Sequence, residues 1–276
     1  MNMDLTHVLD VAQLTDVGKK RDHNEDSVAS DVSSGLLVLA DGMGGYQAGE
    51  VASKMAVLTI MAEMKERLAG SSSGKIDVAS GMQMESTLLR DAVAKANAGI
   101  YHASRTQPQC AGMGTTLVVA LFTNDRVLVG HVGDSRMYRL RGDAFCQITL
   151  DHSLLQEQIR AGLITPEQAR FSNHRNLVTR ALGVDSVVEL ELHEHDVEAG
   201  DIYLMCSDGL SDLVEDDDIY LALRTLNANL TFAARHLVEM ANDNGGYDNI
   251  SVILARPRQP YSAGRHWRHR ILGWLK

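Results

Sequence analysis

The chain has 276 residues, enough for one large domain or two small ones with a substantial core. Hydrophobic residues make up 45% and charged residues 22%, the composition of a soluble globular protein, and no apolar run is long enough to cross a membrane. Met1–Asp10 lacks the basic and then apolar pattern of a signal peptide. Three widely spaced cysteines suit a reducing compartment better than a disulfide framework or a zinc site, so we expect a cytoplasmic protein.

The net charge of −10 is unevenly distributed. Six of the 26 Lys and Arg residues follow Asp248, whereas none of the 36 acidic residues does. The body of the chain is therefore strongly acidic. This argues against nucleic acid as a partner, because duplex binding relies on basic charge to displace counterions. Excess carboxylate is compatible with a protein that holds divalent cations.

Apolar, β-branched stretches predict strands and helical periodicity predicts helices. In chain order we expect strands at Val11–Thr15 and Leu36–Ala40, helices at Glu50–Leu68 and Glu85–Ser104, strands at Thr116–Phe122, Val127–Val132, Met137–Leu140, Val187–Leu192 and Ile202–Cys206, helices at Asp216–Leu226 and Leu230–Ala241, and a strand at Ile250–Ala255. The first helix has an apolar stripe of Val51, Met55, Leu58 and Ala62. Short turns imply antiparallel hairpins, and separate runs of strands and helices predict an α+β fold.

Two segments stand apart from this pattern. Residues 152–180 are polar and helical in pattern, with Pro166 as the expected start of a helix, and we expect them to form a surface flap. Residues 258–276 predict a basic amphipathic tail, separate from a domain over 1–257. The tail either contacts an anionic membrane or a protein partner, or packs on its own domain.

The residues with chemical potential are aspartates beside glycines at the ends of apolar strands. They occur as Asp41-Gly42, Gly133-Asp134, Asp208-Gly209, and Asp248 after Gly245-Gly246. Strand ends can aim short carboxylates at one point, and converging carboxylates repel each other unless cations lie between them. Oxygen ligands select hard cations such as Mg²⁺ or Mn²⁺. The alternative is that each pair only makes a hairpin turn, but four such pairs favour a metal site.

In this context the chain resembles the metal-dependent (PPM, or type 2C) protein phosphatases in their bacterial form. The resemblance rests on an ordered series of motifs across nearly the whole chain: Thr15-Asp16-Val17-Gly18, Arg21-Asp22-His23-Asn24-Glu25-Asp26, Asp41-Gly42-Met43-Gly44-Gly45, Gly112-Met113-Gly114-Thr115-Thr116, Gly133-Asp134-Ser135-Arg136, Asp151-His152-Ser153, Ser207-Asp208-Gly209-Leu210 and Asp248-Asn249. It implies a four-layer αββα sandwich, in which helix pairs flank two antiparallel sheets and a metal cleft lies at one edge.

The resemblance also assigns roles to individual residues. Asp41 would bridge two metals, with the Gly42 carbonyl as a further ligand, and Asp208 and Asp248 would complete the ligands of the first metal. A weaker third metal would use Asp134 with Asp208. Glu25, Asp26 and Asn249 would support these ligands from behind, and Arg21 would bind the substrate phosphate.

The implied reaction is hydrolysis of phosphoserine and phosphothreonine in proteins by in-line attack of a hydroxide that bridges two Mn²⁺ or Mg²⁺ ions. We expect a stand-alone monomer that acts on phosphorylated proteins and opposes a eukaryotic-type Ser/Thr kinase. The alternative within the same fold is a catalytically silent scaffold that binds a signalling partner.

Three positions leave alternatives open. Met43 stands where animal members of the family carry a histidine proposed as the general acid, so His174 in the flap is the candidate for this role and for substrate contact. The alternative is an exposed histidine without a catalytic part. Asp151 and His152 either orient the flap or touch a third metal, or serve as a turn and helix cap. Thr115 and Thr116 are expected to support the metal loops from behind.

Overall fold

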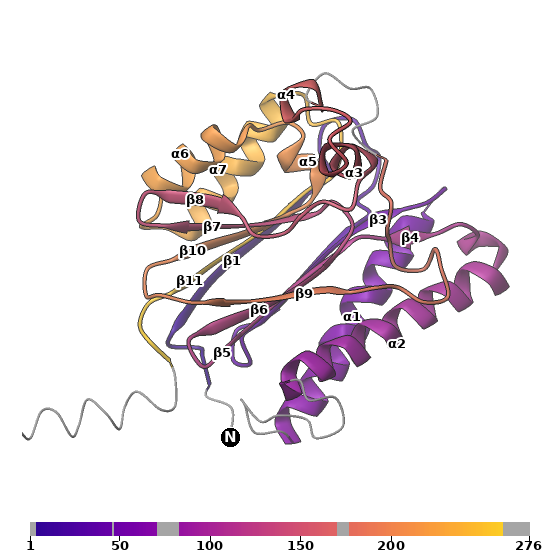
Figure 1. The fold of residues 1–276 in the computed structure, drawn as a ribbon, viewed down its shortest axis with the longest axis horizontal. Coiled ribbons are helices and arrows are strands. Elements are labelled where there is room, and N and C mark those ends of the chain that lie inside the picture. Colours follow the sequence, from indigo (N-terminus) through magenta and orange to yellow (C-terminus); the bar gives the residue numbers. More distant parts are fainter. Residues whose placement is uncertain (1–3, 46, 71–82, 170–176, 262–276) are drawn as a thin grey trace, which may run out of the picture.

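Two antiparallel β-sheets lie face to face at the centre of the protein, and a pair of helices covers the outer face of each (Figure 1). The computed structural model describes residues 4–45, 47–70, 83–169 and 177–261. The first sheet has the order β1 (Leu9–Asp16), β11 (Ile250–Pro257), β10 (Ile202–Cys206), β7 (Arg136–Arg141) and β8 (Ala144–Gln147). The second has the order β2 (Asp26–Asp31), β3 (Leu36–Met43), β5 (Leu117–Thr123), β6 (Arg126–Val132) and β9 (Glu191–Asp196), with β4 (Gly114–Thr115) paired to β3.

The helices follow the same division into two sides. The second sheet is covered by α1 (Ala48–Gly70) and α2 (Met84–Thr106), which is followed by a short 3-10 turn (Pro108–Cys110). The first sheet is covered by α6 (Asp216–Thr225) and α7 (Leu230–Asp243), with the short α5 (Asp208–Ser211) directly after β10. The expected α+β sandwich is therefore confirmed. None of the described helices is long and apolar enough to span a membrane.

Three apolar layers hold the sandwich together, and β3 shows how one strand serves two of them. Leu37 and Leu39 belong to the core between the sheets, whereas Leu36, Val38 and Ala40 belong to the core under α1 and α2. Successive side chains of a strand point to opposite faces, so a strand buried on both faces reads as an unbroken apolar run. This is why the central strands were predicted close to their observed positions.

The polar edge strands were not predicted correctly. The strand expected at 187–192 lies later, at β9, and Val187 is 82% exposed. The polar strands β2 and β8 were missed, as was the two-residue strand β4. An edge strand is stabilised mainly by its pairing with a neighbour, so its own apolar pattern is weak.

The stripe expected on the first helix is also corrected. The buried face of α1 carries Ala52, Ala56, Ile60 and Met64, all of them 0% exposed, whereas Leu58 is 68% exposed. The helix is apolar on more than one face, so its periodicity does not select the buried one. Small alanines allow a close approach to the sheet, and this decides which face packs.

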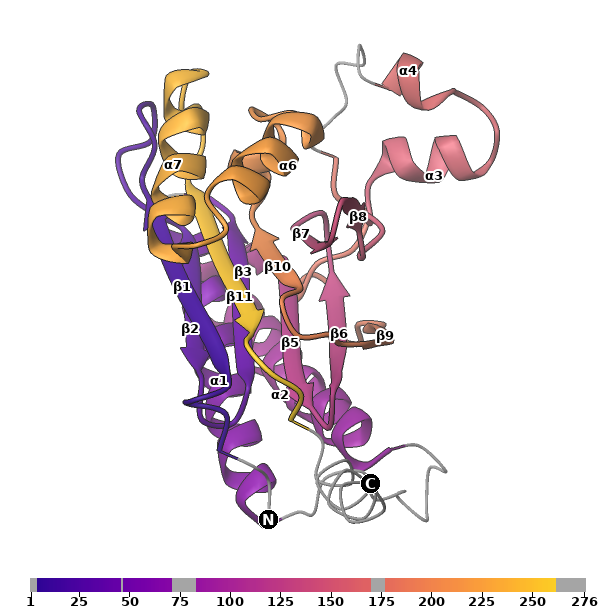
Figure 2. The same ribbon diagram turned by 90° about the vertical axis from the view of Figure 1, so that its left-hand side faces the viewer.

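The flap extends from the body as α3 (Leu154–Arg160) and α4 (Pro166–Ala169), as Figure 2 shows. Pro166 begins a helix as expected. The backbone N–H of Leu154 donates to the carbonyl of Leu177 at 2.9 Å, which ties the two ends of the flap together. The candidate His174 and the amphipathic face expected in the tail lie outside the described residues. The chain is packed on the body as far as Tyr261, whose hydroxyl donates to the Arg126 carbonyl at 3.0 Å.

Replacing Phe122 with Ala should test the core between the sheets. The Phe122 ring packs edge-on against Tyr203, with ring centroids 5.3 Å apart. We expect a loss of about 3–5 kcal/mol in the free energy of unfolding, measured by denaturant titration. Removal of the ring leaves a cavity between the sheets, and the sheets cannot move together to fill it. Phe232→Ala is the control, since that ring is 52% exposed on α7 and its loss should cost below about 1 kcal/mol. Equal losses in the two variants would contradict this account of the core.

Candidate metal centre

Aspartates from both sheets converge at one edge of the sandwich. Asp41 lies near the end of β3, Asp134 in the turn between β6 and β7, Asp208 directly after β10, and Asp248 just before β11. The charges of Asp41 and Asp208 lie close enough for each to act on the pKa of the other, and both pKa values also respond to Asp134 and Asp248. The four Asp-Gly sites far apart in the sequence are thus brought into one cluster.

Burial and like charge act together on this cluster. Burial, followed by the charges of Asp26, Asp134 and Asp248, raises the pKa of Asp41 well above its usual range, although the hydrogen bond with Asp208 opposes the rise. The pKa of Asp208 is raised by burial and then by the surrounding aspartates, with Asp41 first among them. Burial and the nearby Asp151 raise the pKa of Asp134 to about 6. Carboxylates held this close repel one another, which is the electrostatic setting that a multivalent cation relieves.

Glycines allow the loops of the cluster to touch through their backbones. A Cβ added to Gly42 would lie 2.1 Å from the carbonyl oxygen of Gly49, and one added to Gly209 would lie 2.0 Å from that of Asn249. Gly18 has φ +81°, and a Cβ there would lie 2.2 Å from the carbonyl oxygen of Asp248. Any side chain at these positions would push the aspartates apart. Their role is therefore close approach, which is more than turn formation requires.

Hydrogen bonds hold the Asp41 backbone from behind. The Asp41 carbonyl accepts from the Thr115 hydroxyl and from the Thr116 N–H, both at 2.8 Å. The Asp41 N–H donates to the Thr116 hydroxyl at 3.1 Å, and this hydroxyl shares a 2.7 Å bond with that of Ser135. The expectation that the two threonines support the metal loops is confirmed. Ser135 directly follows Asp134, so its bond with Thr116 ties the same network to the turn that carries Asp134.

A second layer of polar groups lies behind the aspartates. The Asn249 side chain accepts from the Glu25 N–H at 2.8 Å and donates to the carbonyls of Val17 and His23, so it ties the start of β11 to the segment before β2. Asp26 accepts from the Ser207 hydroxyl at 2.8 Å. Burial, followed by hydrogen bonds that oppose it and by nearby aspartates that add to it, raises the pKa of Asp26 to about 7.

The Glu25 carboxylate gives a direct test of whether a cation fits this site. Its Oε1 atom is buried and makes no hydrogen bond among the described residues, although His23 Nε2 lies 3.4 Å away. A buried carboxylate oxygen whose nearby donor makes no well-formed hydrogen bond is costly, and a cation or its water would supply a further partner. The donor set consists of carboxylate and carbonyl oxygens, which suit Mg²⁺ and Mn²⁺. The residues present therefore fit divalent cations.

Arg21 and an open cavity give the cluster a face toward solvent. The Arg21 guanidinium donates to Asp248 at 2.6 Å and its side chain is half exposed. A cavity of about 290 Å³ is lined on one side by Asp134 and Asp208 and on the other by flap residues that include Leu155 and Ile159. A ligand in this cavity would contact the carboxylate cluster and the flap at once.

Two residues near the cluster differ from expectation. Asp212 was missed, but its charge acts on both Asp208 and Asp134. It follows Asp208 by four residues, and this helical spacing is the signal that could have found it. Asp151 does not cap the flap helix, because Ser153 does so by accepting from the Gln156 N–H. The Asp151 carboxylate instead accepts a bidentate pair of hydrogen bonds from Arg136, a partner that offers two parallel donors.

Comparisons with known proteins agree on one family. Residues 18–255 match the family described as protein phosphatase 2C. The chain is 39% identical over 251 residues to the serine/threonine protein phosphatase PstP of Mycobacterium tuberculosis, covering 91% of this chain and 45% of that protein. It is 37% identical to the serine/threonine phosphatase stp of Listeria innocua, covering 87% of this chain and 92% of the relative. The chain thus spans less than half of the mycobacterial protein.

Solved structures share the fold as well. The crystal structure of the M. tuberculosis phosphatase PstP aligns with a TM-score of 0.80 over 91% of this chain and 100% of that chain, at 39% identity. The catalytic domain of PstP in complex with two manganese ions aligns with a TM-score of 0.78 at 38% identity, over 90% of this chain and 98% of that one.

Gly42→Ala should disrupt the cluster without removing a carboxylate. The added methyl group would force the carbonyls of Gly49 and Glu25 away from β3, since they would lie 2.1 and 2.6 Å from it. We expect the affinity for Mn²⁺ to fall by at least about tenfold in isothermal titration calorimetry. Gly45→Ala in the same loop is the control, because nothing lies within 4 Å of its added Cβ. Wild-type affinity in both variants would show that the close approach at Gly42 is not required.

Proposed function

The chain belongs to the protein phosphatase 2C family of metal-dependent serine/threonine protein phosphatases, and from this premise we propose that it hydrolyses phosphoserine and phosphothreonine in other proteins at the centre formed by Asp41, Asp208 and Asp248. The observation that carries the proposal is the convergence of these carboxylates beside a half-exposed arginine, Arg21. We propose a catalytic domain over residues 1–257, with the flap at about 152–180, followed by a tail over 258–276 whose first residues, as far as Tyr261, pack on the body.

The carboxylates are the residues that would hold the cations. Asp41 with the Gly42 carbonyl, Asp208 and Asp248 would bind two Mn²⁺ or Mg²⁺ ions, and Asp134 with Asp208 would bind a third, weaker one. When bound, such ions supply a nucleophile from water near neutral pH and neutralise phosphoryl charge. The raised pKa values of Asp41 and Asp208 support this assignment, because they reflect negative charge that the protein itself does not balance.

The remaining site residues position groups around the reacting phosphate. Asn249 orients the segment of Glu25 through its backbone, Asp26 holds the Ser207 hydroxyl next to Asp208, and Glu25 supports the cations from behind. Arg21 binds two oxygens of the substrate phosphate through its planar fork, and its position beside Asp248 supports this role. His174 in the flap, outside the described residues, is our candidate to contact substrate and to protonate the leaving serine or threonine oxygen.

The partners follow from this chemistry. The substrates are phosphorylated proteins, and a eukaryotic-type Ser/Thr kinase is the enzyme class that supplies them. Cys110, Cys146 and Cys206 are free thiols, which supports a reducing compartment and hence the cytoplasm. We further propose that the protein acts as a monomer without nucleic acid, and that the basic tail makes a weak contact with a membrane or a protein.

Asp208→Asn tests the metal centre with almost no change of shape. We expect hydrolysis of a phosphothreonine peptide in Mn²⁺ to fall by at least about 100-fold, since loss of a group that merely supports a metal ligand costs about 10–100-fold. Chelation by EDTA should abolish wild-type turnover. Asp217→Asn is the control, because that carboxylate is exposed on α6 and should leave the rate unchanged. Absence of wild-type turnover with any divalent cation would favour the silent scaffold.

Arg21→Ala should raise the KM for a phosphopeptide by about 10–100-fold, the equivalent of one charge-assisted hydrogen bond of about 1.5–3 kcal/mol. Arg21→Lys keeps the charge and loses the planar pair of donors, so its KM should lie between those of wild type and Arg21→Ala. Steady-state kinetics, with inorganic phosphate added as a competitor, measures KM and kcat. Arg67→Ala on α1 is the control. An unchanged KM with a reduced kcat would mean that Arg21 acts only by holding Asp248.

A further inference from the structure

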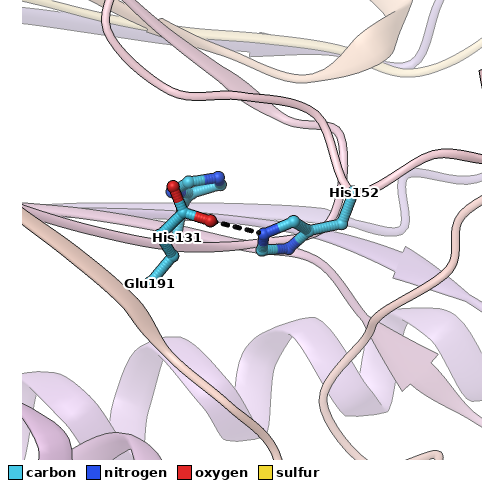
Figure 3. Close-up of side chains that lie close together, drawn as sticks. All are labelled: His131, His152 and Glu191. Atoms are coloured by element: carbon cyan, nitrogen blue, oxygen red, sulfur yellow. Dashed lines mark hydrogen bonds and ion pairs between the residues drawn. The ribbon is translucent and has the colours of Figure 1, made fainter. Parts of the chain in front are cut away.

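A cluster of two buried histidines and a partly exposed glutamate lies near the metal centre but is not part of it. His131, His152 and Glu191 lie close together (Figure 3), and each offers a ligand atom within 4.8 Å of the others. His131 is 0% and His152 7% exposed. His131 on β6 is the register partner of Glu191 on β9, so a rigid sheet supplies two members. His152 comes from the start of the flap.

Hydrogen-bond accounting shows that this cluster is not a metal site in the observed arrangement. The Gly133 N–H donates to His152 Nδ1 at 3.1 Å, so Nε2 must carry the proton and donate to Glu191 at 3.1 Å. His131 Nε2 lies 2.8 Å from the Leu150 carbonyl and is therefore also a donor. His152 has no lone pair left for a cation. The two rings are stacked, with centroids 4.6 Å apart and planes 17° apart, so a single ion cannot lie in both ring planes.

The same bonds join the turn that carries Asp134 to the flap. The His152 N–H donates to the Gly133 carbonyl at 2.9 Å, which with the Nδ1 bond makes a reciprocal pair between residues 133 and 152. The His152 carbonyl accepts from the Thr179 N–H at 2.8 Å, at the far end of the flap. His152, at one end of the flap, therefore contacts both the turn that carries Asp134 and the other end of the flap.

Gly133 has little freedom to respond by itself. It is buried at φ +102°, and a Cβ there would lie 2.8 Å from the Thr116 side chain, which holds Asp41 and Ser135. If His152 Nδ1 did not accept, the Gly133 N–H would be a buried donor without a partner, and the turn would have to shift. Asp134 is the next residue. Flap residues and Asp134 line the same cavity, so a shift of either changes the shape of that cavity.

We propose that His152, oriented by Glu191 and stacked on His131, is a positioning residue that fixes Asp134 relative to the flap. Glu191 acts by holding the proton on Nε2, which keeps Nδ1 as the acceptor for Gly133. Burial opposes the ionised form of Glu191, but hydrogen bonds from His193 and His152 outweigh it and lower the pKa to about 2. The Glu191 carboxylate thus stays charged and accepts from the rings of His193 and His152. The inference rests on the proposed function, because it assigns a support to the weaker of the proposed cation sites.

Two substitutions at His152 separate its two bonds. His152→Asn retains an acceptor at the δ position for Gly133 and loses the contact with Glu191. His152→Gln retains a donor at the ε position for Glu191 and loses the acceptor. We expect His152→Gln to weaken the weakest of three Mn²⁺ sites by about tenfold in calorimetry of the full chain and to leave the two tighter sites unchanged. His152→Asn should stay closer to wild type.

Amide hydrogen exchange supplies a readout that needs no metal. His152→Gln should speed exchange in the peptides that span residues 132–136 and the two ends of the flap, whereas His152→Asn should protect the Gly133 amide. Glu191→Ala, at the partly exposed edge of the sheet, should give the same pattern in a weaker form. His193→Gln is the matched control, because His193 contacts the other oxygen of Glu191 at 2.7 Å and glutamine keeps a donor for it.

The inference is overturned if His152→Gln and His152→Asn match wild type in both measurements. It is also overturned if all Mn²⁺ sites weaken together with a loss of melting temperature, since this is the signature of a general structural role. A Mn²⁺ or Zn²⁺ ion bound by wild type and lost in His131→Gln would overturn it in favour of a metal site at the histidines. Absence of Mn²⁺ binding by wild type would instead contradict the proposed function, and hydrogen exchange would still decide the role of His152.

Discussion

The convergence of negative charge at one edge of the sandwich is the constraint on which the rest of this structure depends. Burial and mutual repulsion raise the pKa values of Asp41 and Asp208, and both effects oppose folding unless a cation is bound. Such a cluster persists only when a rigid frame holds each carboxylate from behind. The hydroxyls of Thr115 and Thr116 bond the backbone of Asp41, and the side-chain amide of Asn249 bonds that of Glu25, so these segments are held without using the carboxylate oxygens of Asp41 and Glu25.

The frame is rigid because three apolar layers clamp the two sheets. Strand β3 contributes to the core between the sheets and to the core under the helices, and Asp41 lies near its end. Strands β10 and β11 do the same on the other sheet for Asp208 and Asp248. At their ends Gly42 and Gly209 let backbones approach within a distance that no side chain would allow. Packing far from the site therefore determines where the oxygens lie.

The flap differs from this frame in its connection to the site. Backbone bonds join its two ends to each other, the His152 N–H joins it to the Gly133 carbonyl, and its helices line a cavity together with Asp134 and Asp208. Coupling between flap and cations requires a contact that belongs to both, and His152 is such a contact because its main chain and its ring bond different segments. A substrate protein that pressed on the flap would then act through Gly133 on Asp134, the residue proposed to hold the weaker cation.

The sequence by itself determined those features that a short stretch of chain specifies. An apolar run followed by Asp-Gly marks a buried strand that ends at a charged turn, and this local pattern was enough to identify Asp41, Asp208 and the α+β layering. The tertiary structure alone decided which face of α1 is buried, where the edge strand β9 lies, and that Glu191 meets His152. Edge strands and exposed helix faces depend on their neighbours for stabilisation, and a hydrogen bond between residues far apart in the chain leaves no periodic signal.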